Sequence, residues 1–243
     1  MKPLSICQQY LLCILNEKGV IKGYTAEKRV CLLAACVLEM RLDGCIKVEQ
    51  KQIRVVKPLP ERLSYFKPLY DFLYEKSPIK IIKMLDAYNI SLTDKKFQEL
   101  FYSLGDSLCE KEVAKRCKAG LLSKKGYRPD REAVDTIIEK MKKEFNGKGK
   151  LSDNSAALLT LLDRSHHLGE YVEKEEQKRM LDYLNTASEA VNGQTLRQQI
   201  VYIQQVLSTL SLTSAVPKKK KKKNPPPTGR GWSFFIQKNY FSM

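Results

Sequence analysis

The side chains of this sequence that are best suited to chemistry are cations close to aromatic residues, and the chemistry they suit is anion binding. Tyr24, Lys28 and Arg29 come just before and inside the start of a long apolar segment. At a helix N-terminus, free backbone N–H groups and the helix dipole favour a phosphate. A second basic group follows later in the chain: Lys115, Arg116, Lys118, Lys124, Lys125 and Arg128. Both groups would also suit an ordinary solvated surface.

The strongest electrostatic feature is a lysine run near the end of the chain. It consists of Lys218, Lys219, Lys220, Lys221, Lys222 and Lys223, and it is followed by three prolines and Trp232. Each lysine near an anionic leaflet contributes on the order of 1 kcal/mol. The aromatic end supplies the second signal that stable anchoring generally needs. Nucleic-acid binding and a nuclear-import address remain as alternatives for this run.

Enzymatic and metal chemistry find little support in the residue pattern. Seven cysteines lie in the first half of the chain and no Cys-x-x-Cys pair exists; the only histidines, His166 and His167, are expected on the surface at a helix end. A structural zinc site needs about four ligands at recognisable spacings. No nucleophile sits in a known signature, and Gly147 to Lys150 lacks the spacing of a phosphate loop. We therefore expect a non-enzyme without cofactor or metal, with reduced thiols acting as small hydrophobes.

The charge balance points to a polyanionic partner. The net charge is +16, and the eight cationic residues after Pro217 account for half of it. The remainder is still basic for a globular domain, as expected for contact with nucleic acid or an anionic membrane. No apolar run approaches the roughly 20 residues that cross a bilayer. The pattern at Met1 to Leu15 does not suit a secretory signal, so we expect a cytoplasmic protein.

The elements that must position these residues are mostly helices. Val30 to Leu38 is an unbroken apolar run, which predicts a helix enclosed by others. Gly44 ends that helix, and a hairpin is expected at Cys45–Val56. Other helices are expected at Ser5–Asn16, Ile79–Tyr88 after Ser77-Pro78, Asp94–Ala119 with a break at Gly105, Asp130–Phe145, Asp153–His166 capped by Ser152, and Glu173–Ala190.

A second hairpin is expected at Leu121–Tyr127, after a stop at Gly120. A helical stripe runs from Leu196 to Leu210, and Thr25 suits an N-cap. The fold class is therefore mainly α, a single helical domain at 1–212 with two small glycine-stopped β-hairpins. Residues 213–243 form a Lys/Pro-rich tail with an aromatic end, which we expect to be disordered because its composition cannot build a core.

Three blocks of this pattern resemble the Golgi phosphoprotein 3 family, which includes a bacterial branch and eukaryotic Golgi adaptors. They are Leu4 to Gly19 with Cys31 to Glu49, Val113 to Leu122, and Ala156 to Tyr171. The order and spacing of the blocks, over about residues 4–190, make the resemblance. It implies a mainly helical protein on the cytosolic face of a membrane, the Golgi in a eukaryote. Its implied partners are a phosphoinositide-like lipid and cytosolic tails of membrane proteins.

Eukaryotic members bind the headgroup of phosphatidylinositol 4-phosphate with an aromatic residue and arginines. The resemblance places Tyr24 at the aromatic position, Leu33 at the first arginine, and Cys109 and Lys111 at the later pair. Lys28, Arg29, Lys115 and Arg116 are near enough in sequence to replace the missing arginines. The membrane-entering loop is expected to be shortened to Ser123–Gly126. Lysine offers a point charge where arginine offers a bidentate clamp, so weak lipid binding is expected.

We therefore predict a peripheral membrane or adaptor protein with weak binding of anionic lipid. The alternative is a nucleic-acid-binding protein of winged-helix type, because two helices followed by a hairpin and a basic balance also suit that fold. Against it, Leu32 to Leu38 would occupy a recognition helix, where polar side chains should contact bases.

Overall fold

The computed structural model describes residues 3–21, 23, 26–89, 94–119, 124–148 and 151–189. This part of the chain is mainly helical, with two small antiparallel sheets, which confirms the predicted fold class. Its helices are α1 (Ile6–Ile14), α2 (Ala26–Leu42), η1 (Glu61–Phe66), α3 (Lys67–Glu75), α4 (Ile81–Asn89), α5 (Lys95–Glu110), α6 (Arg131–Lys148), α7 (Asp153–Arg164), η2 (Leu168–Glu170) and α8 (Lys174–Glu189). Its strands are β1 (Ile46–Glu49), β2 (Gln52–Val55), β3 (Ile79–Lys80), β4 (Ala114–Ala119) and β5 (Lys124–Pro129).

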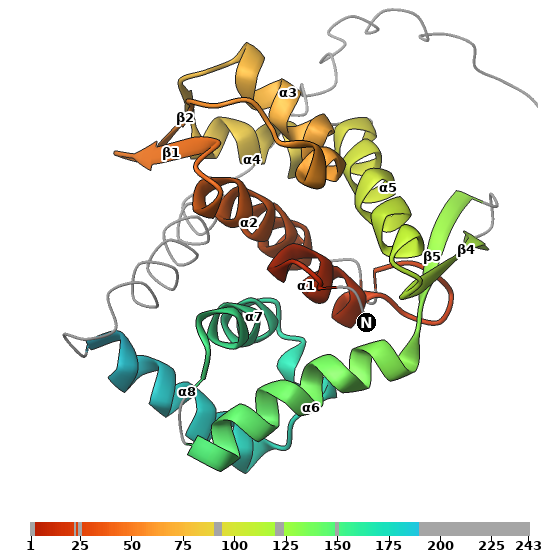
Figure 1. The fold of residues 1–243 in the computed structure, drawn as a ribbon, viewed down its shortest axis with the longest axis vertical. Coiled ribbons are helices and arrows are strands. Elements are labelled where there is room, and N and C mark those ends of the chain that lie inside the picture. Colours follow the sequence, from red (N-terminus) through yellow and green to blue (C-terminus); the bar gives the residue numbers. More distant parts are fainter. Residues whose placement is uncertain are drawn as a thin grey trace, which may run out of the picture.

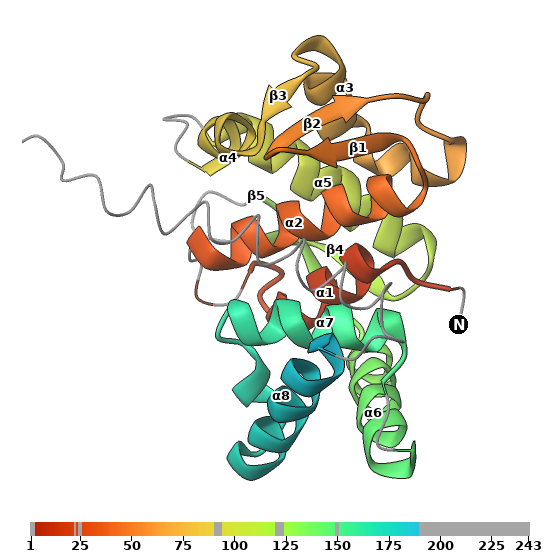
Figure 2. The same cartoon turned by 90° about the vertical axis from the view of Figure 1, so that its left-hand side faces the viewer.

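Helix α2 is the centre of the molecule. Figures 1 and 2 show α1 and α2 between one layer of α3, α4, α5 and the first sheet and a second layer of α6, α7 and α8. Every residue from Lys28 to Leu38 is buried, as the apolar run predicts. Fully burying a leucine side chain contributes about 1.5–3 kcal/mol. The α1–α2 pair therefore holds the two layers together, and it sets where the basic residues at its ends can lie.

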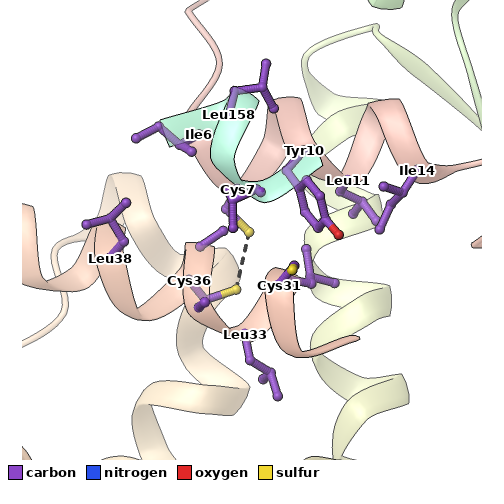
Figure 3. Close-up of a cluster of buried hydrophobic side chains, with 14 of the residues drawn as sticks. Ile6, Cys7, Tyr10, Leu11, Ile14, Cys31, Leu33, Cys36, Leu38 and Leu158 are labelled. Atoms are coloured by element: carbon purple, nitrogen blue, oxygen red, sulfur yellow. Dashed lines mark hydrogen bonds between the residues drawn. The ribbon is translucent and has the colours of Figure 1, made fainter. Parts of the chain in front are cut away.

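The α1–α2 contact contains most of the cysteines (Figure 3). Cys7 and Cys36 face each other with Sγ atoms 3.2 Å apart, and Tyr10 lies beside Cys31. All seven cysteines are free thiols, and five are buried. Burial raises the pKa of Cys13 and Cys31 to about 12. These thiols are therefore protonated at neutral pH and pack as small apolar side chains.

The first hairpin follows α2 as predicted. Gly44 has φ +75°, the left-handed conformation that ends a helix, and β1 pairs with β2 across Gln50 and Lys51. The structure adds a strand that the sequence did not predict. Ile79 and Lys80 pair with β2 instead of starting a helix at Ser77-Pro78, so α4 begins only at Ile81.

The second hairpin begins earlier than predicted. Helix α5 ends at Glu110, and Glu112, with φ 63°, makes the stop that the sequence assigned to a glycine. Strand β4 then occupies the segment predicted as the end of the helix. Strand β5 begins at Lys124, so the two strands are connected by residues 120–123, whose placement is outside the described residues. The expected loop at Ser123–Gly126 is therefore wrong, because Lys124 to Gly126 pair with β4.

Gly105 is not the predicted helix break, since α5 is continuous through it. A Cβ at this position would lie 2.2 Å from the Tyr127 ring. We expect Gly105→Ala to lower the free energy of unfolding by about 1–3 kcal/mol, because the added methyl overpacks the contact between α5 and β5. Urea unfolding followed by circular dichroism measures this loss.

Gly147→Ala in α6 is the matched control, because a Cβ there meets nothing within 4 Å. It should raise the free energy of unfolding by up to about 1 kcal/mol through helix propensity. A Gly105→Ala protein as stable as the parent would contradict the close packing of Tyr127 on α5.

The helices of the second layer follow the sequence closely. Helix α6 starts after Asp130, as predicted, and extends to Lys148, three residues beyond the predicted end at Phe145. Ser152 accepts a hydrogen bond from the backbone N–H of Ser155 and caps α7, which confirms the predicted cap. The predicted cap Thr25, the stripe at 196–210 and the tail lie outside the described residues. No helix in the described ranges has the length and apolar character to span a membrane.

Candidate functional site

Arg29 lies in the second turn of α2 as a buried link between three helices. Its Nη2 donates to the Tyr88 carbonyl of α4 at 2.7 Å, and Nη1 is 2.9 Å from Oδ1 of Asp94. The guanidinium stacks on Phe97 of α5, 4.2 Å from the ring centroid. Asp94 also accepts the first hydrogen bond of α5 through its backbone carbonyl. These contacts occupy the guanidinium that the sequence offered as an anion ligand.

The other residues of the first predicted group, Lys28 and Tyr24, provide no exposed anion ligand in the described part of the chain. Lys28 is buried, with only 7% of its surface exposed, and its Nζ lies 3.7 Å from where Gly23 would place a Cβ. Tyr24, the aromatic member of the group, lies outside the described residues. Leu33, at the position of the family's first arginine, is completely buried in the α2 core. An arginine side chain at this position would have no access to solvent. The close packing of the α2 core therefore explains why an apolar residue stands where the family has a cation.

Lys111 belongs to a polar network that holds the start of α1. Its Nζ donates to the Pro3 carbonyl at 2.6 Å and to Oε1 of Gln8 at 2.8 Å. Gln8 forms a capping box with Ser5 and also donates to Ser107 of α5. Glu39 of α2 accepts from the Ile6 N–H; burial raises the pKa of this carboxyl, and that hydrogen bond opposes the rise. Lys111 therefore fixes local structure.

The predicted single pocket is not formed. Arg29 contacts the N-terminal end of α5 through Asp94 and Phe97, whereas Lys111 caps the C-terminal end of the same helix. Sixteen helical residues separate the two ends, a length of about 24 Å. Lys28 and Arg29 cannot share one phosphate with Lys111 at that distance. The sequence alone could not show this separation, because tertiary packing decides which end of α5 contacts Arg29.

Lys115 and Arg116 lie on the second hairpin, together with the other later cations. We define the basic hairpin as β4 and β5 with six exposed cationic side chains: Lys115, Arg116, Lys118, Lys124, Lys125 and Arg128. Neither strand contains an acidic residue. The register sets Lys115 opposite Arg128 and Lys118 opposite Lys125. Like charges directly opposite each other destabilise a sheet, so this hairpin has a charge excess that an anion would relieve.

One acidic side chain neutralises part of that excess. Asp106 of α5 lies 2.8 Å from Nε of Arg116 and 2.6 Å from Nζ of Lys125, and it accepts from the Tyr127 hydroxyl at 3.1 Å. Partial burial works against ionisation of Asp106, but these hydrogen bonds prevail and hold its pKa below the ordinary value. Asp106 therefore anchors the hairpin on α5, while Lys115, Lys118 and Lys124 are exposed and form no ion pair within the described residues.

A hollow of about 310 Å³, which we call the hairpin pocket, lies between the hairpin and the first half of α5. Its walls include Phe97 and Phe101 of α5 and Ala119 of β4, with Lys124 and Lys125 at the edge. The pocket connects the Arg29 cluster to the basic hairpin. Sequence reasoning missed it because the Phe97–Phe101 spacing predicts only an inward face of a helix.

Two other predicted features also change. His167 was expected on the surface at a helix end; it is buried, and its Nε2 lies 3.0 Å from the Cys13 carbonyl. Helix α2 is enclosed, so it cannot enter a nucleic-acid groove as the winged-helix alternative requires. In the parts of the chain that the structure describes, no group of side chains could hold a metal ion.

Comparison with known protein families finds a match over most of the chain. The family model described as Golgi phosphoprotein 3 (GPP34) matches residues 7–203 of this chain. A comparison with curated protein sequences gives no significant match. The matched range includes all of α1 except Ile6, every later element to α8, and therefore the whole basic hairpin and its pocket.

Proposed function

The chain belongs to the Golgi phosphoprotein 3 family, and from this premise we propose that it is a peripheral membrane adaptor that binds an anionic lipid surface through the basic hairpin. The observation that carries the proposal is the cross-strand pairing of Lys115 with Arg128 and of Lys118 with Lys125. Lys115 faces Arg128, and Lys118 faces a Lys125 that shares the single carboxylate of Asp106 with Arg116, so a surface of opposite charge stabilises the sheet. Phospholipid headgroups provide such a surface.

The sequence between the strands fits the same role. Gly120-Leu121-Leu122-Ser123 connects β4 to β5, so two leucines are flanked by lysines on both sides. Apolar side chains beside cations suit the boundary between acyl chains and headgroups. Each cation near an anionic leaflet adds about 1 kcal/mol, less for Arg116 and Lys125, which Asp106 already neutralises.

The proposal favours weak headgroup selectivity. Arg29 is engaged by Asp94 and Tyr88, and Lys111 is engaged by Pro3 and Gln8. The exposed ligands are then mostly lysines, which attract phosphate without fixing its orientation. Binding should follow the charge density of the membrane rather than one phosphoinositide. The cargo of the adaptor is proposed by family membership alone: short cytosolic tails of membrane proteins.

A charge reversal on the hairpin tests the proposal. We expect Lys115→Glu, Lys118→Glu and Lys124→Glu together to lower binding to vesicles of phosphatidylcholine with 20% phosphatidylserine at least 100-fold, because about 1 kcal/mol is lost for each of the three cations. The fold should be retained, because two of the changes replace repulsive cross-strand pairs with attractive ones. Flotation at two salt concentrations measures the binding.

The matched control is Lys47→Glu, Lys83→Glu and Lys178→Glu, which changes the net charge equally at exposed positions outside the hairpin. It should retain most of the binding. Equal losses in both variants would mean that net charge alone drives association, and the hairpin proposal would be wrong. A gel shift with duplex DNA runs in parallel; DNA binding that survives at a salt concentration where flotation is lost would favour the nucleic-acid alternative.

A further inference from the structure

A second groove, which we call the tyrosine groove, lies on the first layer of the molecule. It has a volume of about 570 Å³ and runs between the end of β2 and helix α3. Its apolar walls are Val56, Pro58, Leu59, Pro60, Tyr70 and Tyr74. None of its lining residues belongs to the hairpin pocket. The proposed membrane role therefore leaves this groove without a function.

The groove contains two of the four exposed large apolar side chains of the described residues. Tyr74 is 66% exposed and Val56 is 42% exposed, and only two other large apolar side chains of the described residues are exposed. The Tyr70 and Tyr74 rings stack at a centroid distance of 6.2 Å and an angle of 20°. The Tyr70 hydroxyl donates to the Lys57 carbonyl at 2.9 Å, which fixes that ring. The pair therefore offers a preformed aromatic surface.

This surface suits a proline-rich segment. Polyproline II helices bind in aromatic-lined grooves, where pyrrolidine rings pack on tyrosine or tryptophan with little loss of conformational entropy. The charges at the edge of the groove also favour a segment with a cation next to its prolines. Lys67 pairs with Asp71 at 2.8 Å, while Glu61 has no ion pair within the described part of the chain. A cation beside the prolines would complete the charge balance at Glu61.

We infer that the tyrosine groove binds Pro225–Pro227 of the chain's own C-terminal segment. This is the only run of three prolines in the sequence, and Lys223 and Arg230 flank it with the required cations. Thirty-five residues separate Glu189, the last of α8, from Pro225. A fully helical connection of that length spans about 50 Å and an extended one more than 100 Å, so the segment is long enough to cross a domain of this size.

Because the proline segment and the groove belong to the same chain, a weak contact is sufficient to keep the groove occupied. A segment tethered to its own domain has an effective concentration on the order of 1 mM. An intrinsic dissociation constant of about 0.1 mM would then keep the groove about 90% occupied. The two stacked tyrosine rings and the two prolines of the groove therefore need to provide only this weak intrinsic affinity.

The single tryptophan of the chain, Trp232, provides the readout, because it lies five residues after Pro227. In the full-length protein we expect Tyr74→Ala to raise acrylamide quenching of Trp232 about twofold, and replacement of Pro225, Pro226 and Pro227 by alanine to do the same. Tyr74→Phe keeps the ring and should leave quenching unchanged. Since Tyr74 is largely exposed, the alanine variant should fold, which circular dichroism checks.

A titration with a proline decapeptide identifies the occupant. Because the tail competes for the groove, the decapeptide should bind the alanine-for-proline variant about tenfold more tightly than the parent. Equal affinities would mean that the groove is open to an external proline-rich protein, and the inference would be wrong. Quenching that is the same in the parent, Tyr74→Ala and the proline variant would also overturn it. Quenching that increases on dilution would assign the contact to a second copy of the chain and would overturn the intramolecular inference.

Discussion

Replacing Arg29 by alanine is expected to lower the free energy of unfolding by about 3 kcal/mol, the low end for breaking a buried ion pair, because its partner Asp94 is partly exposed. The Tyr88 carbonyl would lose its donor and Phe97 its stacked cation. A protein of this size should then melt roughly 6–12 °C lower. Chemical denaturation and thermal scans followed by circular dichroism measure both effects.

Arg116→Ala is the matched control, since Arg116 also pairs with an aspartate but is 59% exposed. Surface ion pairs contribute about 0–1 kcal/mol, so this variant should stay within that range of the parent. Vesicle binding of Arg29→Ala, measured below its melting temperature, should be unchanged. An Arg29→Ala protein of full stability that no longer binds vesicles would show that Arg29 is a headgroup ligand, as the resemblance implied.

The different roles of these two arginines show which parts of the fold could be predicted from the sequence. The apolar run at Val30–Leu38 predicts an enclosed helix whatever surrounds it, and the structure confirms the burial. The Gly44 stop, the first hairpin and the Ser152 cap rest on local chemistry and are also confirmed. Such features depend on residues a few positions apart, so one sequence contains the information.

The parts that could not be predicted depend on contacts between distant residues. The stop before β4 uses Glu112 in a left-handed conformation, without the glycine that marks such stops. Strand β4 exists because β5 pairs with it and Tyr127 packs on Gly105. Strand β3 likewise depends on pairing with β2. The helix predicted through Ala119 was therefore wrong by the length of one strand.

The candidate site likewise has local features that the sequence shows and long-range features that it does not show. The charges of the two basic groups are visible in the sequence, but their separation along α5 is not. Lys111 is engaged by groups 108 and 103 residues away, Pro3 and Gln8, and no local pattern announces that contact. The hairpin cations could be listed from the sequence, whereas their like-charge register appears only when the strands are paired.

In the proposed function, the lysine run at Lys218–Lys223 is a second membrane contact beside the basic hairpin. Two independent cationic surfaces on one chain bind a membrane together, because the second contact forms at a high effective concentration once the first is made. The hairpin and the tail should therefore contribute more than additively to vesicle affinity.

We expect deletion of residues 218–243 to weaken binding to anionic vesicles at least 100-fold, because six lysines contribute on the order of 1 kcal/mol each before entropy is subtracted. The melting temperature should fall by no more than about 6 °C, since a tail held by one shallow groove at ten times its dissociation constant contributes only about 1.4 kcal/mol. Flotation and a thermal scan of the same preparation measure the two effects.

Full-length variants separate charge from length. Replacing Lys218–Lys222 by glutamine keeps the tail, its prolines and the flanking Lys223, so it should lose nearly as much vesicle binding as the deletion while leaving Trp232 quenching unchanged. Trp232→Ala should cost less, because it removes only the interfacial aromatic anchor. If the deletion lowered the melting temperature by many degrees, the tail would have to be an integral part of the fold. If the glutamine variant bound vesicles like the parent, the lysine run would have no membrane role, and the basic hairpin alone would have to account for the affinity.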